Sequence, residues 1–205
     1  MSIPAEKERM RAEVRGRLRA MPAGAWAEAS LAVARRVRSM ESWSHARWIG
    51  AYAPMAREID VWPLVGEALA SGVGVAMPGW DEASGTYRFV RVMDMSRDMV
   101  DGPHGARVPA RGLPGVDVGR LDLVLVPGIA FDAAGGRLGR GKGFYDRLLD
   151  GCVGVTCGVC VGEQVVERVP MEPHDARLDW VVFPGGIHGK TTGAGARRLG
   201  SGTSD

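Results

Sequence analysis

A glycine-rich loop that carries several cations is the part of this sequence best suited to chemistry. Glycines and basic residues alternate within the run GGRLGRGKG: Arg137, Gly139, Arg140, Gly141, Lys142 and Gly143. Glycines let the backbone approach an anion closely with its N–H groups turned inward, and the cations add positive charge at the same place. Asp146 follows on a predicted helix, where its carboxylate suits the Mg²⁺ that accompanies a triphosphate. The loop therefore predicts a nucleotide phosphate site.

Two general phosphate-binding patterns fit this loop incompletely. Residues 136–142 have the GxxxxGK spacing of a P-loop, but Gly143 stands where that motif has the Ser or Thr that binds Mg²⁺. The GxGxG run also differs from the dinucleotide pattern GxGxxG. A plain flexible connection is a further interpretation. Three cations in so short a segment favour an anion site, because like charges without an anion repel one another.

The segments around the loop alternate between predicted strands and helices. A helical region covers residues 5–39 and divides near Pro22. Strands are predicted at 47–53, 74–78, 87–93, 121–126, 153–161 and 178–183, helices at 62–71 and 144–149, and an irregular segment at 94–118. The continuous apolar run at 121–126 is typical of a central parallel strand. These features predict an α/β fold: an open, mostly parallel, Rossmann-like three-layer sheet with helices on both faces and an N-terminal helical segment.

This fold would bring two distant polar segments to one edge of the sheet. Ligands of open α/β sheets bind beyond the C-terminal ends of the strands. Glu58 follows the strand at 47–53, and the glycine loop follows the strand at 121–126. We therefore expect both to face one site.

The composition is that of a single globular domain. The 205 residues are 45% hydrophobic and 24% charged, and we predict one domain over residues 1–186 and a flexible Gly/Ser/Thr-rich tail over 187–205. A net charge of +2 gives no reason to expect a nucleic-acid partner. No apolar run reaches the roughly 20 residues of a membrane span, and the N-terminal segment lacks a secretory signal. We expect a cytoplasmic protein with no membrane partner.

The cysteines agree with a reducing compartment. Cys152, Cys157 and Cys160 are an odd number grouped on one predicted strand, which does not build a disulfide framework. The CxxC spacing has no second pair beside it. We interpret these thiols as small apolar core residues.

The run PGIAFDAAGGRLGRGKGFYDRLL closely resembles the signature of the 5-formyltetrahydrofolate cyclo-ligase family, also called 5,10-methenyltetrahydrofolate synthetases. The resemblance extends to about Gly186. It includes Lys7-x-x-x-Arg11, RLRAM, Glu58-Ile59-Asp60, Glu163-Gln164 and PMEPHDARLDWVV, all in family order.

The resemblance implies a reaction and a set of site residues. ATP and Mg²⁺ would convert 5-formyltetrahydrofolate to 5,10-methenyltetrahydrofolate through a phosphorylated formyl oxygen, releasing ADP and phosphate. The implied partners are ATP and a reduced folate, in a monomer or weak dimer. The implied ATP contacts are Lys7, Arg11, Arg137, Gly139, Arg140, Gly141, Lys142, Gly143, Phe144 and Tyr145. The implied substrate contacts are Ala53, Glu58, Arg140, Gly141, Lys142, Gly143 and Phe144. The implied catalytic residues are Glu58, Arg140 and Lys142. The implied Mg²⁺ ligands are Asp146 and Asp175.

Several of these residues have a plain structural alternative. Lys7 and Arg11 lie four positions apart and could be a solvated helix stripe. Asp175 could simply stabilise a turn. The four histidines are scattered without ligand spacing, and we assign no zinc site.

Two departures from the family pattern concern the substrate. Phe144 stands where the family usually has a tyrosine, and Val108 stands where relatives carry Glu or Gln before a proline. The apolar Val108 could not make the polar folate contact that the Glu or Gln of relatives implies. It leaves open an enzyme that uses ATP on a different pterin or amide-like acceptor. A non-catalytic nucleotide- or RNA-binding module is an alternative of another class.

Overall fold

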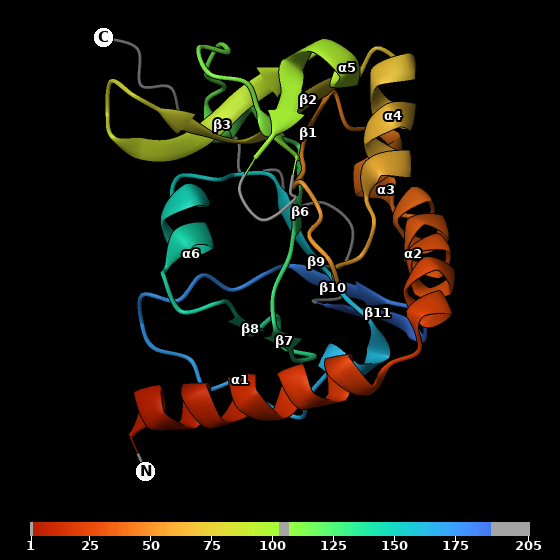
Figure 1. Cartoon of the computed structure of the whole chain (residues 1–205), viewed down its shortest axis with the longest axis vertical. Coiled ribbons are helices and arrows are strands. Elements are labelled where there is room, and N and C mark those ends of the chain that lie inside the picture. The colour runs from red at the N-terminus through yellow and green to blue at the C-terminus, as the bar shows by residue number, and fades with distance from the viewer. Residues whose placement is uncertain (1, 103–106, 190–205) are drawn as a thin grey trace, which may run out of the picture.

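A seven-stranded sheet forms the centre of the structure, a computed structural model that describes residues 2–102 and 107–189 (Figure 1). In spatial order the strands are β11 (Gly186–Gly189), β10 (Trp180–Phe183), β9 (Val155–Val159), β6 (Leu123–Val126), β1 (Trp48–Gly50), β2 (Gly74–Asp81) and β3 (Thr86–Val92). The strands from β10 to β2 are parallel, whereas the edge strands β3 and β11 are antiparallel to their neighbours. The predicted mostly parallel α/β sheet is confirmed.

Strand β6 occupies the middle of the sheet, as its sequence predicts. All of its residues, LVLV, are buried, because both faces of the sheet are covered. One core cluster joins the sheet to the long N-terminal helices and includes Val14, Val33 and Leu64. The other cluster, which includes Leu148 and Phe89, lies on the opposite face. This double coverage is why the central strand tolerates an uninterrupted apolar sequence.

Helices lie on both sides of the sheet. Their bounds are α1 (Ile3–Ala20), α2 (Ala23–Arg38), α3 (Glu41–Ser44), α4 (Trp62–Ala70), α5 (Met95–Asp98) and α6 (Phe144–Leu148). Figure 1 shows α2 and α4 on one side, α6 on the other, and α1 across the end of the molecule near β7 and β8. The predicted break before Pro22 is confirmed: Met21 is extended, the conformation that a following proline favours. Helix α4 connects the parallel strands β1 and β2, as predicted.

The segment predicted as irregular contains regular elements. Beside α5 it forms a short antiparallel pair, β4 (Met99–Asp101) and β5 (Arg107–Pro109), and a 3₁₀ turn at Val118–Arg120. The Asp94 carboxylate accepts hydrogen bonds from the backbone N–H groups of Ser96 and Arg97 and so begins α5. Strands of three residues are too short to give a periodic pattern, which is why the prediction was wrong here.

A hairpin that was not predicted separates β6 from the glycine loop. Strands β7 (Ala130–Phe131) and β8 (Arg137–Leu138) pair antiparallel. The buried Asp132 carboxylate organises their turn by accepting from the backbone N–H groups of Ala134, Gly136 and, across the structure, Val169. The first glycine of the apparent GxxxxGK motif thus belongs to a hairpin turn and not to an anion loop.

The chain also continues in a strand beyond the last predicted one. Residues Gly186–Gly189 form β11 and pair with β10, so the first residues assigned to the tail belong to the sheet. The ring of His188 stacks on Phe183 at a centroid distance of 4.9 Å. The rest of the predicted tail, 190–205, lies outside the described residues. No helix within 2–102 or 107–189 is long and apolar enough to cross a membrane.

Candidate active site

A pocket of about 810 Å³ lies at the C-terminal edge of the parallel strands. Residues that follow β1 and β6, and residues within β2, form part of its wall: Tyr52, Ala53, Met77, Pro78, Pro127 and Gly128. Every site residue expected from the sequence lines this pocket: Lys7, Arg11, Ala53, Glu58, Arg137, Gly139, Arg140, Gly141, Lys142, Gly143, Phe144, Tyr145, Asp146 and Asp175. The fold therefore brings together segments that are far apart in the sequence.

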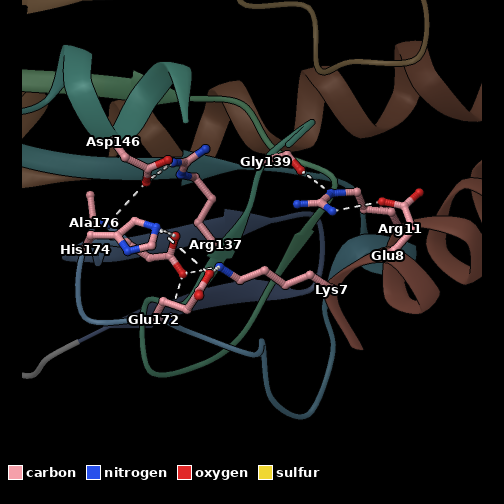
Figure 2. Close-up of polar contacts among 10 residues, drawn as sticks. Lys7, Glu8, Arg11, Arg137, Gly139, Asp146, Glu172, His174 and Ala176 are labelled. Atoms are coloured by element: carbon pink, nitrogen blue, oxygen red, sulfur yellow. Dashed lines mark hydrogen bonds and ion pairs between the residues drawn. The ribbon is translucent and has the colours of Figure 1, made fainter. Parts of the chain in front are cut away.

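Helix α1 presents two cations to the pocket. Lys7 and Arg11 share one face of the helix with the buried residues Val14 and Leu18, a spacing of four, three and four positions. The Lys7 side chain is 10% exposed, and that of Arg11 is 12% exposed. Arg11 Nε donates to the carbonyl of Gly139 at 2.9 Å, which ties the helix to the glycine loop (Figure 2). The interpretation of a solvated stripe is wrong.

Lys7 binds a group of acidic residues from the loop before β10. Its Nζ donates to Glu172 Oε2 at 2.7 Å and to Asp175 Oδ2 at 2.5 Å. Burial acts against both charges, but the hydrogen bonds prevail: they raise the pKa of Lys7 above its ordinary value and lower that of Asp175. His174 Nε2 lies 3.7 Å from Asp175 Oδ1. Potential ligand atoms of Glu172, His174 and Asp175 all lie within 4.8 Å of one another, a cluster that the sequence analysis missed.

Arg137 and Asp146 form a second ion pair, deeper in the wall. Arg137 Nη2 donates to Asp146 Oδ1 at 2.7 Å, and the guanidinium carbon lies 5.5 Å from the centroid of the Tyr145 ring. The backbone N–H of Ala176 donates to the same carboxylate oxygen at 3.2 Å. These contacts connect β8, α6 and the loop before β10 (Figure 2).

A tight turn after β1 fixes Glu58. Its backbone N–H donates to the carbonyl of Met55, and its Oε2 accepts from the Met55 N–H at 2.9 Å. Arg57 has φ +63°, a left-handed conformation that is uncommon for a residue other than glycine. The Glu58 side chain is 9% exposed, and its Oε1 accepts from Arg140 Nη2 at 2.8 Å. The turn thus holds a carboxylate against the glycine loop.

The glycine loop needs glycine at the positions where its backbone is left-handed. Gly141 has φ +101°, and a Cβ atom added to it would come within 3.5 Å of the Arg11 guanidinium carbon; Gly143 has φ +58° just before α6. The two cations between Gly139 and Gly143 are accessible: the Arg140 side chain is 52% exposed, and Lys142 is also exposed. A bound anion could reach both.

Aromatic rings form the wall on the α6 side. Tyr87, Phe144 and Tyr145 line the pocket, and edge-to-face contacts at 5.0 to 5.2 Å link them in a row that ends at Trp80. Burial first, and the Glu58 carboxylate second, raise the pKa of Tyr145 well above its ordinary value, so its phenol stays neutral. Phe144, at the position where a tyrosine was expected, contacts the rings of Tyr87 and Tyr145 and has no hydroxyl.

The segment that departs from the family pattern reaches the pocket as well. Val108 in β5 lines the wall between Arg107 and Pro109. Arg107 Nη2 donates to the carbonyls of Met95 and Met99, which holds this segment against α5 and β4. At this place the pocket wall presents an apolar side chain.

The charges of the pocket suit a polyanion with a divalent cation. Among the residues that the structure describes, six cationic side chains and four carboxylates line it: Lys7, Arg11, Arg107, Arg137, Arg140 and Lys142, and Glu58, Asp146, Glu172 and Asp175. Carboxylate oxygens are the protein ligands that Mg²⁺ prefers. In the described residues, the hydrogen bonds to Asp146 and Asp175 use Oδ1 and Oδ2, respectively, which leaves one oxygen on each for a cation. The donor set therefore fits Mg²⁺.

Comparisons with known proteins agree on one family. The model of the 5-formyltetrahydrofolate cyclo-ligase family matches residues 3–184. A 5-formyltetrahydrofolate cyclo-ligase of Mus musculus is 27% identical over 195 residues, 89% of this chain and 96% of the relative. One of Saccharomyces cerevisiae is 28% identical over 209 residues, 90% and 98% of the respective chains.

A solved structure shares the fold. The NMR structure of the Aquifex aeolicus 5,10-methenyltetrahydrofolate synthetase superposes with a TM-score of 0.79 and 27% sequence identity, covering 95% of this chain and 98% of that one. Because the family model spans nearly all of the described residues and the sheet matches that of a solved relative, the chain belongs to the 5-formyltetrahydrofolate cyclo-ligase family of enzymes.

Proposed function

We propose that this chain uses ATP and Mg²⁺ to convert 5-formyltetrahydrofolate to 5,10-methenyltetrahydrofolate, with release of ADP and phosphate. One observation carries the proposal: cations from α1 and the glycine loop, Glu58 after β1 and the carboxylates near β10 meet in one pocket of about 810 Å³. That volume lies within the range typical of small-molecule sites. The family of the chain supplies the substrate class.

The accessible cations suit the triphosphate. Arg140 and Lys142 project from backbone that glycine keeps close to the pocket, and Lys7 and Arg11 face them from α1. Arg140 would exchange Glu58 for a phosphate oxygen, and Lys7 would exchange its carboxylates in the same way. Catalysis of phosphoryl transfer depends mainly on such positioning and charge neutralisation.

Asp146 and Asp175 would hold Mg²⁺, each with the carboxylate oxygen that its hydrogen bonds leave available. The bound ion would neutralise charge on the phosphates. Glu172 lies beside Asp175 and contacts the same lysine, so it can contribute a further oxygen on that side.

The proposed reaction has two stages. The formyl oxygen attacks the γ-phosphorus of ATP; an oxygen–phosphorus bond forms, the bond to the bridging oxygen breaks, and ADP leaves. N10 of the folate then attacks the formyl carbon and loses its proton. The carbon–oxygen bond breaks, and phosphate departs with the electron pair. The product carries a positive charge shared by N5 and N10.

Glu58 is placed to act on the second stage. Its carboxylate is held by the Met55–Glu58 turn, close to the Tyr52 and Tyr145 rings. A fixed negative charge in so little water would stabilise the cationic product and orient the N–H groups of the pterin. The aromatic wall of Tyr87 and Phe144 would pack against the planar parts of the ligands.

The test is to incubate the purified protein with 5-formyltetrahydrofolate, ATP and Mg²⁺ and to follow both the absorbance of the methenyl product and the release of phosphate. We expect both signals to rise together, and neither to rise without ATP or in EDTA. Phosphate release without methenyl product would mean a different acceptor and would overturn the proposal. ATP binding with no turnover would favour a non-catalytic binding module and would overturn it as well.

A further inference from the structure

Arg137 differs from the other cations of the glycine loop in where its charged group lies. Its side chain is 3% exposed, compared with 52% for Arg140 only three positions later. A Cβ atom added to Gly139 would come within 2.9 Å of Arg137 Nη1, so the backbone of the loop lies directly over the guanidinium. The arginine expected to bind phosphate is thus packed beneath the loop.

The buried position of Arg137 is energetically unfavourable in one respect. Within the described residues, its Nε is a buried donor without a hydrogen-bond partner. A buried guanidinium with an unsatisfied N–H is costly, and apolar residues of similar volume often replace buried ion pairs without loss of stability. Stability alone therefore does not account for an arginine here.

The buried Arg137 side chain fixes the position of the Asp146 carboxylate. Arg137 Nη2 and the backbone N–H of Ala176 both donate to its Oδ1, from two different segments (Figure 2). Held from both sides, the carboxylate cannot rotate freely, and its other oxygen keeps one direction. Ala176 directly follows Asp175, so the same contacts also fix the relative position of the two carboxylates assigned to Mg²⁺.

We propose that Arg137 is a positioning residue, which orients Asp146 for Mg²⁺ from beneath the loop and makes no direct contact with the phosphates of ATP. This inference rests on the function proposed above, in which Asp146 is a ligand of Mg²⁺. Removing a residue that orients a metal ligand in this way typically lowers metal affinity or activity by about 10–100-fold.

Two variants and a double variant test the proposal through ATP binding measured by calorimetry, once in Mg²⁺ and once in EDTA. For Arg137→Met we expect ATP affinity in Mg²⁺ to fall roughly 10–100-fold and affinity in EDTA to stay within about twofold of wild type. Asp146→Asn should lose the same Mg²⁺-dependent part. The double variant should bind no more weakly than Asp146→Asn, because Arg137 acts through that carboxylate.

Three further variants separate positioning from other roles. Arg140→Met should weaken ATP binding in EDTA as well, because Arg140 is exposed and expected to contact phosphate. Arg137→Lys should recover part of the Mg²⁺-dependent affinity. Arg36→Met removes a part-buried arginine of α2 that donates to the carbonyl of Pro184 and is not among the residues that line the pocket, and it should leave ATP binding unchanged in both buffers.

The outcomes distinguish this proposal from the one it rests on. If Arg137→Met weakens binding in EDTA as Arg140→Met does, or if its effect adds to that of Asp146→Asn, then Arg137 binds phosphate directly and the proposal is wrong. If Mg²⁺ does not tighten ATP binding by the wild type, the proposed function fails and this inference fails with it. Should Arg137→Met not fold, Arg137→Lys is judged by the same two comparisons.

Discussion

Replacing Lys7 by methionine removes the cation that joins α1 to the loop before β10. Methionine keeps the apolar stem of the side chain, so the change acts mainly on the charge. Lys7 donates two charge-assisted hydrogen bonds, to Glu172 and Asp175, and its side chain and that of Asp175 are only 10% and 12% exposed. Without Lys7, the two neighbouring carboxylates lose the ammonium group that lies between them.

The expected loss of stability follows from these contacts. A hydrogen bond to a charged group contributes about 1.5–3 kcal/mol, and water in the open pocket reduces the sum of two such bonds, so we expect a loss of about 2–4 kcal/mol. For a domain of this size, 1 kcal/mol corresponds to about 2–4 °C in Tm, so the melting temperature should fall by roughly 4–16 °C.

A matched control lies on the same helix. Arg17 pairs with Glu13 one turn earlier, and the two side chains are 44% and 58% exposed. Exposed pairs contribute at most about 1 kcal/mol, so Arg17→Met should lower Tm by no more than roughly 4 °C. Thermal unfolding followed by circular dichroism compares the variants directly. Equal melting temperatures for Lys7→Met and Arg17→Met would refute the reasoning.

The pH dependence of this difference adds a second check. The pKa of Asp175 is lowered below 3.8 in the folded protein, so its contribution is present above that value and is lost as pH falls through the folded pKa. The pKa of Lys7 is raised above 10.5, so its contribution is complete below that value and is lost as pH rises through the folded pKa. The difference in stability between wild type and Lys7→Met should therefore be constant from about pH 5 to 9 and shrink at both extremes.

Three other changes test separate parts of the pocket. Glu58→Gln should lower kcat by at least about 100-fold with little change in ATP affinity, because a fixed charge is lost at the reacting centre. The control is Glu67→Gln, at a glutamate whose side chain is 41% exposed. Equal kcat values for the two variants would mean that Glu58 has no role in the reaction. Gly141→Ala should destabilise the folded protein by about 1–2 kcal/mol and weaken ATP binding, because the φ of Gly141 is +101°. The control is Gly66→Ala in α4, where an added Cβ meets no atom within 4 Å, and this change should be neutral or stabilising. Denaturant unfolding compares the two variants, and equal unfolding midpoints would contradict the argument. Val108→Gln places an amide in the pocket wall and should lower KM for the reduced folate while KM for ATP is unchanged; steady-state kinetics measures both, and an unchanged folate KM would count against a folate contact at this position.

The sequence predicted the elements that carry strong patterns. The apolar run of β6, the helix between β1 and β2, and the break at Pro22 each follow from local rules about burial, length and proline geometry. The hairpin β7–β8 could not be predicted from such local rules, because strands of two residues leave no periodic signal. It is held by one buried side chain, Asp132, whose partners include Val169, 37 positions later. Such long-range contacts are outside the reach of a local pattern.

The residues that the sequence predicted to lie together do line one pocket, but their contacts with one another were not predicted. Lys7, Glu58 and Asp175 were expected in one place and do line one pocket. Their pairing with one another, and the inclusion of Glu172, depend on how α1 lies against the loop before β10. The burial of Arg137 depends on the hairpin that the sequence did not reveal. A signal for Glu172 was available, since it precedes Asp175 by three positions in the same turn.

The contact between Lys7 and Asp175 spans 168 positions of the chain. During translation, α1 leaves the ribosome well before its partner, because the strands β1, β2, β3, β6 and β9 are all synthesised between them. A nascent chain that already includes the glycine loop therefore still lacks one side of the pocket, the loop before β10. Termination before Asp175 should therefore leave Lys7 without its acidic partners and the proposed nucleotide site incomplete.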